Sequence, residues 1–237
     1  SVSLKGASAP AGASVARGGR RCREWRSGHS TASTEWAAPD RPAWPNPACG
    51  HSRPASWQAA LDALAGAGHA VTQGSAADAQ RRCVSAFATV QDPAGNTLEL
   101  YWGRKLDYVP LVSPTGVSGF VTTYQQTGDM GFGHCVLPAP DLDATTTFYT
   151  QFLGTGLTDT LYPPGMEGMQ INFMHANNPR QHSVALFNGP HPLGVVHIMV
   201  EVQTIDEVGK AMQRAKQAGA HFLATLGRHV NDNMCSI

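Results

Sequence analysis

An internal repeat restricts the fold of this chain more than any other feature of its sequence. The segment GHCVLPAPDLDATTTFY, which starts at Gly133, aligns without a gap with VHIMVEVQTIDEVGKAM, which starts at Val196. The alignment places His134 opposite His197. In each copy the histidine opens a short apolar strand, and a helix follows that begins near an acidic residue, where the helix dipole favours negative charge. The repeat predicts two copies of one supersecondary unit that pack together.

The pattern within each copy is βαβββ. We expect helices over residues 141–153 and 205–218. Strand-like segments follow each helix, and the last strand of the second copy is absent. The fold class is therefore α+β. The expected later strands are MQINFMHAN and HSVALFN in the first copy, and HFLATLG and NMCSI in the second.

The region before the repeat divides into two parts. From about Ser56 the sequence is typical of a globular domain: SWQAALDALAGAGHAV predicts a helix, and VSAFATVQDPAGNTLELYWG predicts two strands around a turn. We therefore expect a partial N-terminal module and connector over 56–130, and a C-terminal module over 131–237.

Residues 1–55 have a different composition. Their only Ile, Leu, Val, Met or Phe residues are Val2, Leu4 and Val15, and they are rich in Ala, Ser, Gly, Pro and Arg. Such a segment cannot bury enough apolar surface to fold, so we expect it to be disordered. A basic arm that binds an acidic partner is the alternative. We hypothesise that the segment derives from a shifted reading frame or a mispredicted start.

The overall charge and hydropathy exclude two classes of partner. The formal net charge is +0, which argues against nucleic acid, since binding it requires a basic surface. No apolar run is long enough to cross a membrane. The N-terminus lacks the pattern of a signal peptide, so we expect a cytoplasmic protein.

The two repeated histidines suggest a metal site. Matched positions in duplicated units come to matched places, so His134 and His197 are expected to meet across a concave face. Two neutral imidazoles and one carboxylate form the facial triad of non-haem Fe(II) oxygenases. The alternative is that both are ordinary core histidines.

Four motifs together resemble a known family. GFGHCVLPAPDLDATTTFYTQFLG, NPRQHSVALF, GVVHIMVEV and TLGRHVNDNMCS are similar to the type I extradiol ring-cleavage dioxygenases of the vicinal oxygen chelate superfamily. The resemblance covers about residues 56–237, and TLGRHVND at this distance after HIMVEV is its most specific part. It implies the vicinal oxygen chelate fold, in which paired βαβββ modules form an open, barrel-like mixed sheet, with the N-terminal module incomplete in this sequence.

The resemblance also implies roles for individual residues. His134 and His197 match the Fe(II) ligands, and His182 matches the active-site acid/base histidine. His229 matches a histidine beside the substrate, and Asp232 is a candidate for its hydrogen-bonding support. The implied reaction cleaves the ring of a catechol such as 2,3-dihydroxybiphenyl next to the diol and inserts both atoms of O2. A neutral imidazole at His182 could take a proton from the catechol. The family tends to form homo-oligomers.

The third family ligand has no counterpart in this sequence. It is a glutamate on the final strand of the C-terminal module, and the sequence ends at Ile237 before that strand. The matching strand of the N-terminal module is present and carries Glu99. With two histidines alone, we expect weak Fe(II) binding and little or no turnover.

Several alternatives stay open. A glyoxalase-like lyase or isomerase would use the same fold with more carboxylate ligands, and a metal-poor protein that binds a small molecule would need no third ligand. Glu201 shares a strand face with His197, and we favour a structural hydrogen bond for it over metal ligation. Alternation along the strand predicts that His182 shares a face with Val184 and Leu186. The side chains that could line a pocket or belong to the core are Phe173, Phe187 and Met199.

Overall fold

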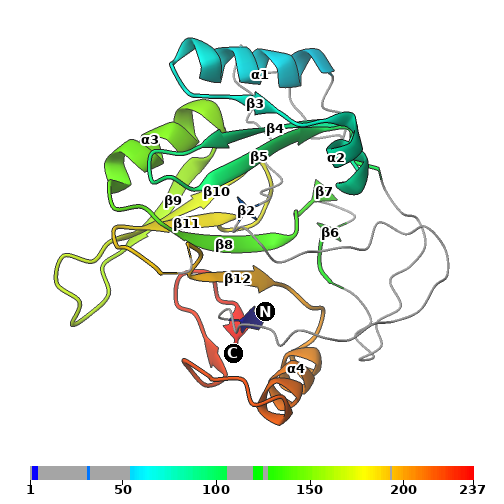
Figure 1. Cartoon of the computed structure of the whole chain (residues 1–237). Helices are drawn as coiled ribbons and strands as arrows, with labels where there is room; N and C mark the ends of the chain where they lie inside the picture. Colours follow the sequence, from blue (N-terminus) through cyan, green and yellow to red (C-terminus); the bar gives the residue numbers. More distant parts are fainter. Residues whose placement is uncertain (1, 5–30, 33–53, 106–119, 125–127, 193) are drawn as a thin grey trace.

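The structure is a computed structural model that describes residues 2–4, 31–32, 54–105, 120–124, 128–192 and 194–237. The expectations for residues 1–55 lie almost entirely outside these residues. The proposed boundaries at 55 and 130 stay predictions. Within the described chain the architecture is α+β, as predicted, with one four-stranded and one six-stranded sheet (Figure 1).

The N-terminal module is a four-stranded sheet with a helix packed on it. The strand order is β2-β5-β4-β3, and β4 and β5 form the predicted hairpin. Leu61 and Leu64 of α1 are buried, and the indole Nε1 of Trp57 donates a hydrogen bond of 3.1 Å to the carbonyl of Leu100 on β5. The elements are α1 (Pro54–Gly66), β2 (Thr31–Ala32), β3 (Thr72–Gln73), α2 (Ala76–Arg81), β4 (Ala86–Gln91) and β5 (Thr97–Trp102).

The first copy of the repeat forms the predicted βαβββ unit. Its strands follow the order β8-β11-β10-β9, and β11 runs parallel to β8 while the other pairs are antiparallel. Strand β9 was not assigned from the sequence, because its burial alternates poorly and all six of its residues are at least partly exposed. The elements are β8 (Gly133–Pro138), α3 (Leu142–Phe152), β9 (Gly156–Leu161), β10 (Ile171–His175) and β11 (Val184–Phe187).

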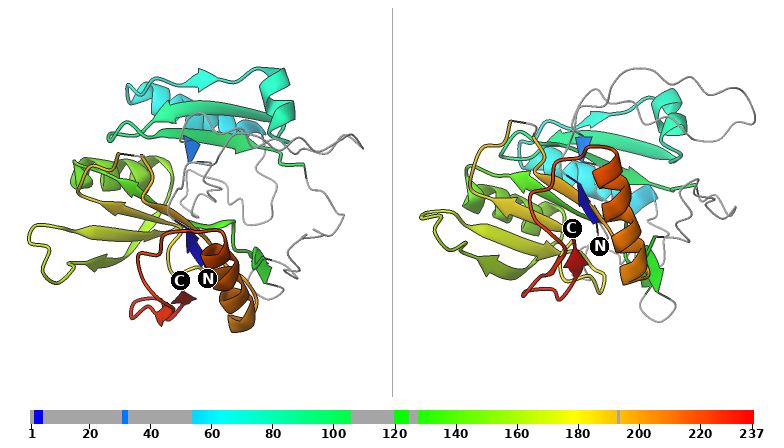
Figure 2. Two further views of the ribbon diagram at one scale, coloured as in Figure 1. Left: turned by 60° about the horizontal axis from the view of Figure 1, so that its bottom comes forward. Right: turned by 90° about the horizontal axis from the view of Figure 1, so that it is seen from below.

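The second copy begins as predicted and then becomes less regular. Strand β12 pairs antiparallel with β8 on one side and with β1 on the other, and α4 follows at the end of the molecule opposite α1 (Figure 2). The prediction of a strand over HFLATLG is wrong, since Gly227, the last residue of the segment, is the only one of its residues in a described strand. No described strand pairs with 221–226, and Leu223 and Leu226 are exposed. The elements are β1 (Val2–Leu4), β12 (His197–Val200), α4 (Ile205–Gln217), β13 (Gly227–Arg228) and β14 (Cys235–Ser236).

The two modules share one apolar core. Leu64, Val90 and Leu98 of the N-terminal module belong to the same buried cluster as Leu137 and Met174 of the first repeat copy. A short hairpin, β6 (Thr123–Tyr124) and β7 (Gly128–Asp129), precedes β8. Among the described helices, none combines the length and the apolar character that a membrane span requires.

Candidate functional site

His134 and His197 meet on adjacent antiparallel strands. Their Nε2 atoms are 3.1 Å apart, and their ring centroids are 5.3 Å apart. His134 pairs with Met199 across the β8–β12 ladder, and His197 pairs with Val136, so the two imidazoles are diagonal neighbours on one sheet face. The predicted convergence of the repeated histidines is therefore confirmed as a geometric fact.

A glycine permits this close approach of the two strands. A Cβ atom at Gly133 would lie 1.9 Å from the carbonyl oxygen of Met199, which is backbone and cannot move aside as a side chain can. Only glycine therefore fits directly before His134. Gly133 therefore lets β8 approach β12 closely enough for the imidazole of His134 to contact that of His197.

His182 completes a cluster of three imidazoles. Its ring centroid lies 4.2 Å from that of His134, and its ring packs edge-on against Phe173 at 4.7 Å. The side chain is buried, with 3% of the residue exposed, and its Nδ1 contacts Oε1 of Gln181. If Nδ1 donates to this oxygen, Nε2 is left as a proton acceptor.

The predicted orientation of His182 is wrong. Val184 and Leu186 point into the core shared by the two modules, whereas His182 contacts His134 and Phe173 on the opposite side of the sheet. Alternation holds only within a paired strand, and the β10–β11 pairing starts at Val184. His182 lies in the loop before it.

Burial keeps the three imidazoles neutral. Burial lowers the pKa of His182 to about 4; His197, His229 and Arg180 add to the lowering, and Asp232 opposes it. Burial also lowers the pKa of His197 to about 4. The pKa of His134 lies well below its ordinary value, chiefly through burial and then through its imidazole neighbours. Neutral imidazole is the form that binds metals and accepts protons.

His229 lies on the β13–β14 hairpin and makes two side-chain contacts. Its Nε2 is 2.8 Å from the hydroxyl of Ser236, and its Nδ1 is 3.5 Å from Oδ1 of Asp232. Asp232 also accepts a hydrogen bond of 2.9 Å from the backbone N–H of Met234. Asp232 therefore supports both the hairpin and the ring of His229. The side chain of His229 is exposed and stays outside the cluster of three.

Arg180 lies beside the cluster and was not identified from the sequence. Its side chain is 5% exposed, and it forms an ion pair of 2.9 Å with Glu201. The prediction that Glu201 makes a structural contact is thereby confirmed. The sequence shows only that Arg180 lies two positions before His182. Its burial could not be predicted, because hydrophobic periodicity gives no information on burial in a loop.

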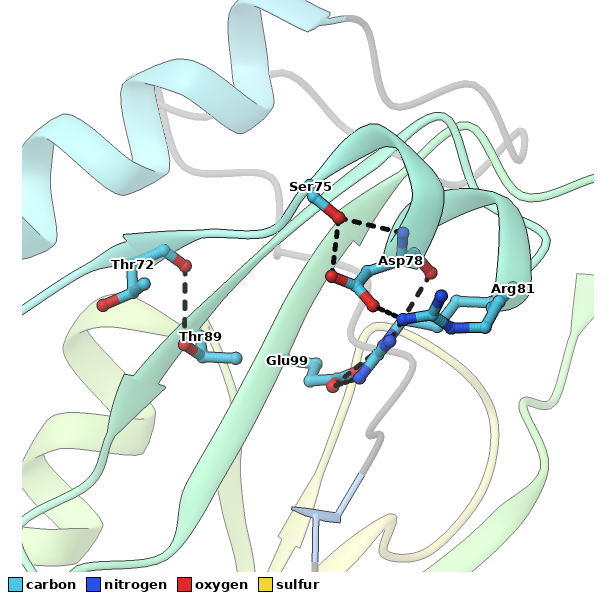
Figure 3. A network of polar contacts seen from close by, with 7 residues as sticks. Thr72, Ser75, Asp78, Arg81, Thr89 and Glu99 are labelled. Atoms are coloured by element: carbon cyan, nitrogen blue, oxygen red, sulfur yellow. Dashed lines mark hydrogen bonds and ion pairs between the residues drawn. The ribbon is translucent and has the colours of Figure 1, made fainter. Parts of the chain in front are cut away.

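Glu99 occupies the position in the N-terminal module that matches the family's third metal ligand, and here it forms an ion pair instead. Glu99 is buried and accepts three hydrogen bonds of 2.6–2.9 Å from the guanidinium of Arg82. Arg82 also lies over the ring of Phe87, 4.2 Å from its centroid. Figure 3 shows Glu99 within a polar network that also includes Asp78 and Ser75 of the α2 start. Glu99 is therefore a structural residue in this module.

The histidine pair fits a metal ion. Two imidazole nitrogens bound to one metal at about 2.1 Å, at a right angle, would lie about 3 Å apart, close to the observed separation of the Nε2 atoms. Nδ1 of His134 is buried and has no hydrogen-bond partner among the described residues. No set of three or more His, Cys, Asp or Glu side chains in the described part of the chain is arranged to hold a metal. The described donor set is thus two imidazoles.

Phe173, Phe187 and Met199 lie on the same sheet face as His134 and His197, as the strand registers show. Phe187 belongs to a small buried cluster with Val136 and Ala185, and Phe173 packs against that cluster. Met199 is 3% exposed. Of these three residues, Phe173 also contacts the site, through the ring of His182.

Comparison with known proteins places this arrangement in a family. Residues 131–237 match the Glyoxalase/Bleomycin resistance protein/Dioxygenase superfamily, so this part of the chain belongs to that superfamily. The chain is similar to an iron-dependent extradiol dioxygenase of Rhodococcus jostii (strain RHA1), with 41% identity over 189 residues, which cover 77% of this chain and 61% of that protein. It is also similar to a biphenyl-2,3-diol 1,2-dioxygenase of Paraburkholderia xenovorans (strain LB400), with 39% identity over 74% of this chain and 57% of that protein.

A solved structure agrees with these relatives. The crystal structure of BphC, a halotolerant catechol dioxygenase, matches with a TM-score of 0.68 and 32% identity, covering 77% of this chain and 59% of that one. The resemblance to the extradiol dioxygenases and the vicinal oxygen chelate fold are confirmed. The chain spans about three fifths of the length of these relatives.

Proposed function

We propose that the chain is an extradiol dioxygenase sequence whose histidine cluster binds Fe(II) and directs cleavage of a catechol ring next to the diol, with insertion of both atoms of O2. The observation that supports this most is the 3.1 Å approach of Nε2 of His134 to Nε2 of His197, with a third, buried imidazole packed against the first. The similarity to dioxygenases of biphenyl-2,3-diol supports the substrate class.

The proposed division of labour follows from the positions of the side chains. His134 and His197 would hold the metal, which when bound would supply positive charge and bring catechol and O2 together. His182, neutral and buried beside His134, would accept a catechol hydroxyl proton at Nε2. His229 and Asp232 would face the substrate from the β13–β14 hairpin, where Ser236 orients the imidazole of His229.

The proposal includes weak metal binding by this chain. Two neutral imidazoles provide fewer contacts than a facial triad and no charge to offset that of the metal. Assembly into a homo-oligomer is also part of the proposal and would be visible as a molar mass above 25.1 kDa in light scattering.

The test uses the purified chain with Fe(II) and 2,3-dihydroxybiphenyl or a simpler catechol. Without oxygen, we expect an absorbance change that requires both metal and catechol. Admitting air should then produce a yellow ring-opened product, at a low rate. His197→Ala should abolish both signals. Silence with every catechol at saturating Fe(II) would reject the proposed reaction.

A second function is favoured by the small donor set. With two imidazoles in the described residues, the chain could bind an aromatic diol without metal or turnover. Catechol binding measured by calorimetry in the presence of a chelator distinguishes the two. Binding that survives metal removal and the His197→Ala substitution supports the binding protein, and loss of binding supports the metal site.

A further inference from the structure

Arg180 joins two positions of the connector, Val121 and Met130, to Glu201, the residue after β12. Its Nε donates a hydrogen bond of 3.0 Å to the carbonyl of Met130, and its Nη2 donates one of 3.3 Å to the carbonyl of Val121. Its Nη1 forms the 2.9 Å ion pair with Glu201, whose side chain is 12% exposed. All three nitrogens of the guanidinium therefore have protein partners.

Three of these four joined positions lie close in sequence to a histidine of the cluster. Met130 precedes His134 by four residues, Glu201 follows His197 by four, and Arg180 itself precedes His182 by two. The backbone reinforces the junction, since the N–H of Val121 donates to the carbonyl of Glu201 at 2.9 Å. One planar guanidinium thus links sequence positions close to all three histidines.

The interaction is not simply a stabilising ion pair. Burying two charges costs desolvation that their attraction often fails to offset, so a buried pair is weak evidence for stability. The planar guanidinium of Arg180 instead holds its three partners in fixed directions, because its N–H donors have a rigid geometry that an ammonium group lacks. The positive charge also disfavours protonation of His134 and His182, as a smaller contribution after burial.

We propose that Arg180 is a positioning residue: with Glu201, it sets the relative placement of His134, His182 and His197 without contacting metal or substrate. The inference rests on the proposed function in one respect, namely that the histidines form a metal site. Partners that orient metal ligands typically contribute about 10–100-fold to metal affinity. Loss of Arg180 should therefore weaken metal binding in a chain that still folds.

The experiment measures Co(II) binding by titration calorimetry and visible absorption, at a temperature where circular dichroism shows every variant folded. Arg180→Met should weaken Co(II) binding at least about tenfold and change the absorption spectrum, and Arg180→Lys should recover part of the affinity. The matched control is Arg82→Met, which removes the Arg82–Glu99 ion pair of the N-terminal module. It should lower the thermal midpoint and leave Co(II) affinity within about twofold of the wild type.

The outcomes separate this inference from the proposed reaction. Arg180→Met with wild-type affinity, or an equal loss in Arg82→Met, would overturn the positioning role. If Arg180→Met does not fold, Glu201→Gln keeps the volume of the partner and should still weaken Co(II) binding, and unchanged affinity would overturn the inference. A wild-type chain that binds no Co(II) rejects the metal site and this role together. A chain that binds Co(II) and cleaves no catechol rejects only the reaction.

Discussion

Single residues determine how the metal-free protein responds to acid. Burial holds the pKa of His182 and His197 at about 4, below the value expected in the unfolded chain. The folded state therefore binds fewer protons than the unfolded state between about pH 4 and 6.5, so stability falls as the pH decreases through this range and is level above it. We expect a lower urea midpoint at pH 5 than at pH 7.5.

A substitution assigns this pH dependence to the cluster. His182→Gln removes one of the neutral imidazoles, so the difference between the two urea midpoints should shrink. Burial raises the pKa of Asp92, so this carboxyl group changes the stability with pH in the opposite direction. Its contribution is the same in the wild type and in His182→Gln. Equal pH dependence in both proteins would contradict the prediction.

The same substitution separates proton transfer from metal binding. In the iron-loaded chain, His182→Gln should reduce single-turnover ring cleavage by at least about 100-fold, because an amide cannot accept the catechol proton. Metal affinity should change little, since the metal is assigned to His134 and His197. His221→Gln is the control, because His221 is exposed. Wild-type rates in His182→Gln would reject the assignment of His182 as the proton acceptor.

At the scale of elements, the repeat was enough to predict which strands would bring the histidines together. Its apolar strands and following helices appear as β8, α3, β12 and α4, close to the predicted bounds. The orientation of His182 could not be predicted, because it depends on where the β11 pairing begins. The role of Arg180 was equally hidden, since its partners Met130 and Val121 lie 50 or more positions away.

The approach of β8 and β12 is the element-scale feature most open to test. Gly133→Ala would place a Cβ against the Met199 carbonyl, so the strands must separate and the imidazoles with them. We expect a stability loss of about 1–3 kcal/mol and weaker Co(II) binding. Gly209→Ala in α4 is the matched control: nothing lies within 4 Å of its added Cβ, and it should stabilise the protein by about 0.5–1 kcal/mol. Unchanged Co(II) affinity in Gly133→Ala would show that the strands tolerate the extra atom.

At the scale of the whole molecule, strand β8, which carries His134, shares a core with the N-terminal module. The cluster that includes Leu64 and Leu98 continues to Leu137 on β8, three residues from His134. The hydroxyl of Tyr149 on α3, which is fully buried, donates a hydrogen bond of 3.2 Å to Asp92 in the turn between β4 and β5. The modules should therefore unfold together, although the imidazoles all belong to the second one.

Tryptophan fluorescence can test this coupling, because all five tryptophans precede residue 103 and the described ones, Trp57 and Trp102, lie in the N-terminal module. Co(II) bound at His134 and His197 stabilises only the folded state, by about 2.7 kcal/mol at a concentration 100 times its Kd. If the shared core makes unfolding cooperative, Co(II) should raise the urea midpoint reported by the tryptophans. His197→Ala should remove this increase. Metal binding by the wild-type chain with no change in the tryptophan transition would mean that the N-terminal module unfolds independently, despite the continuous core.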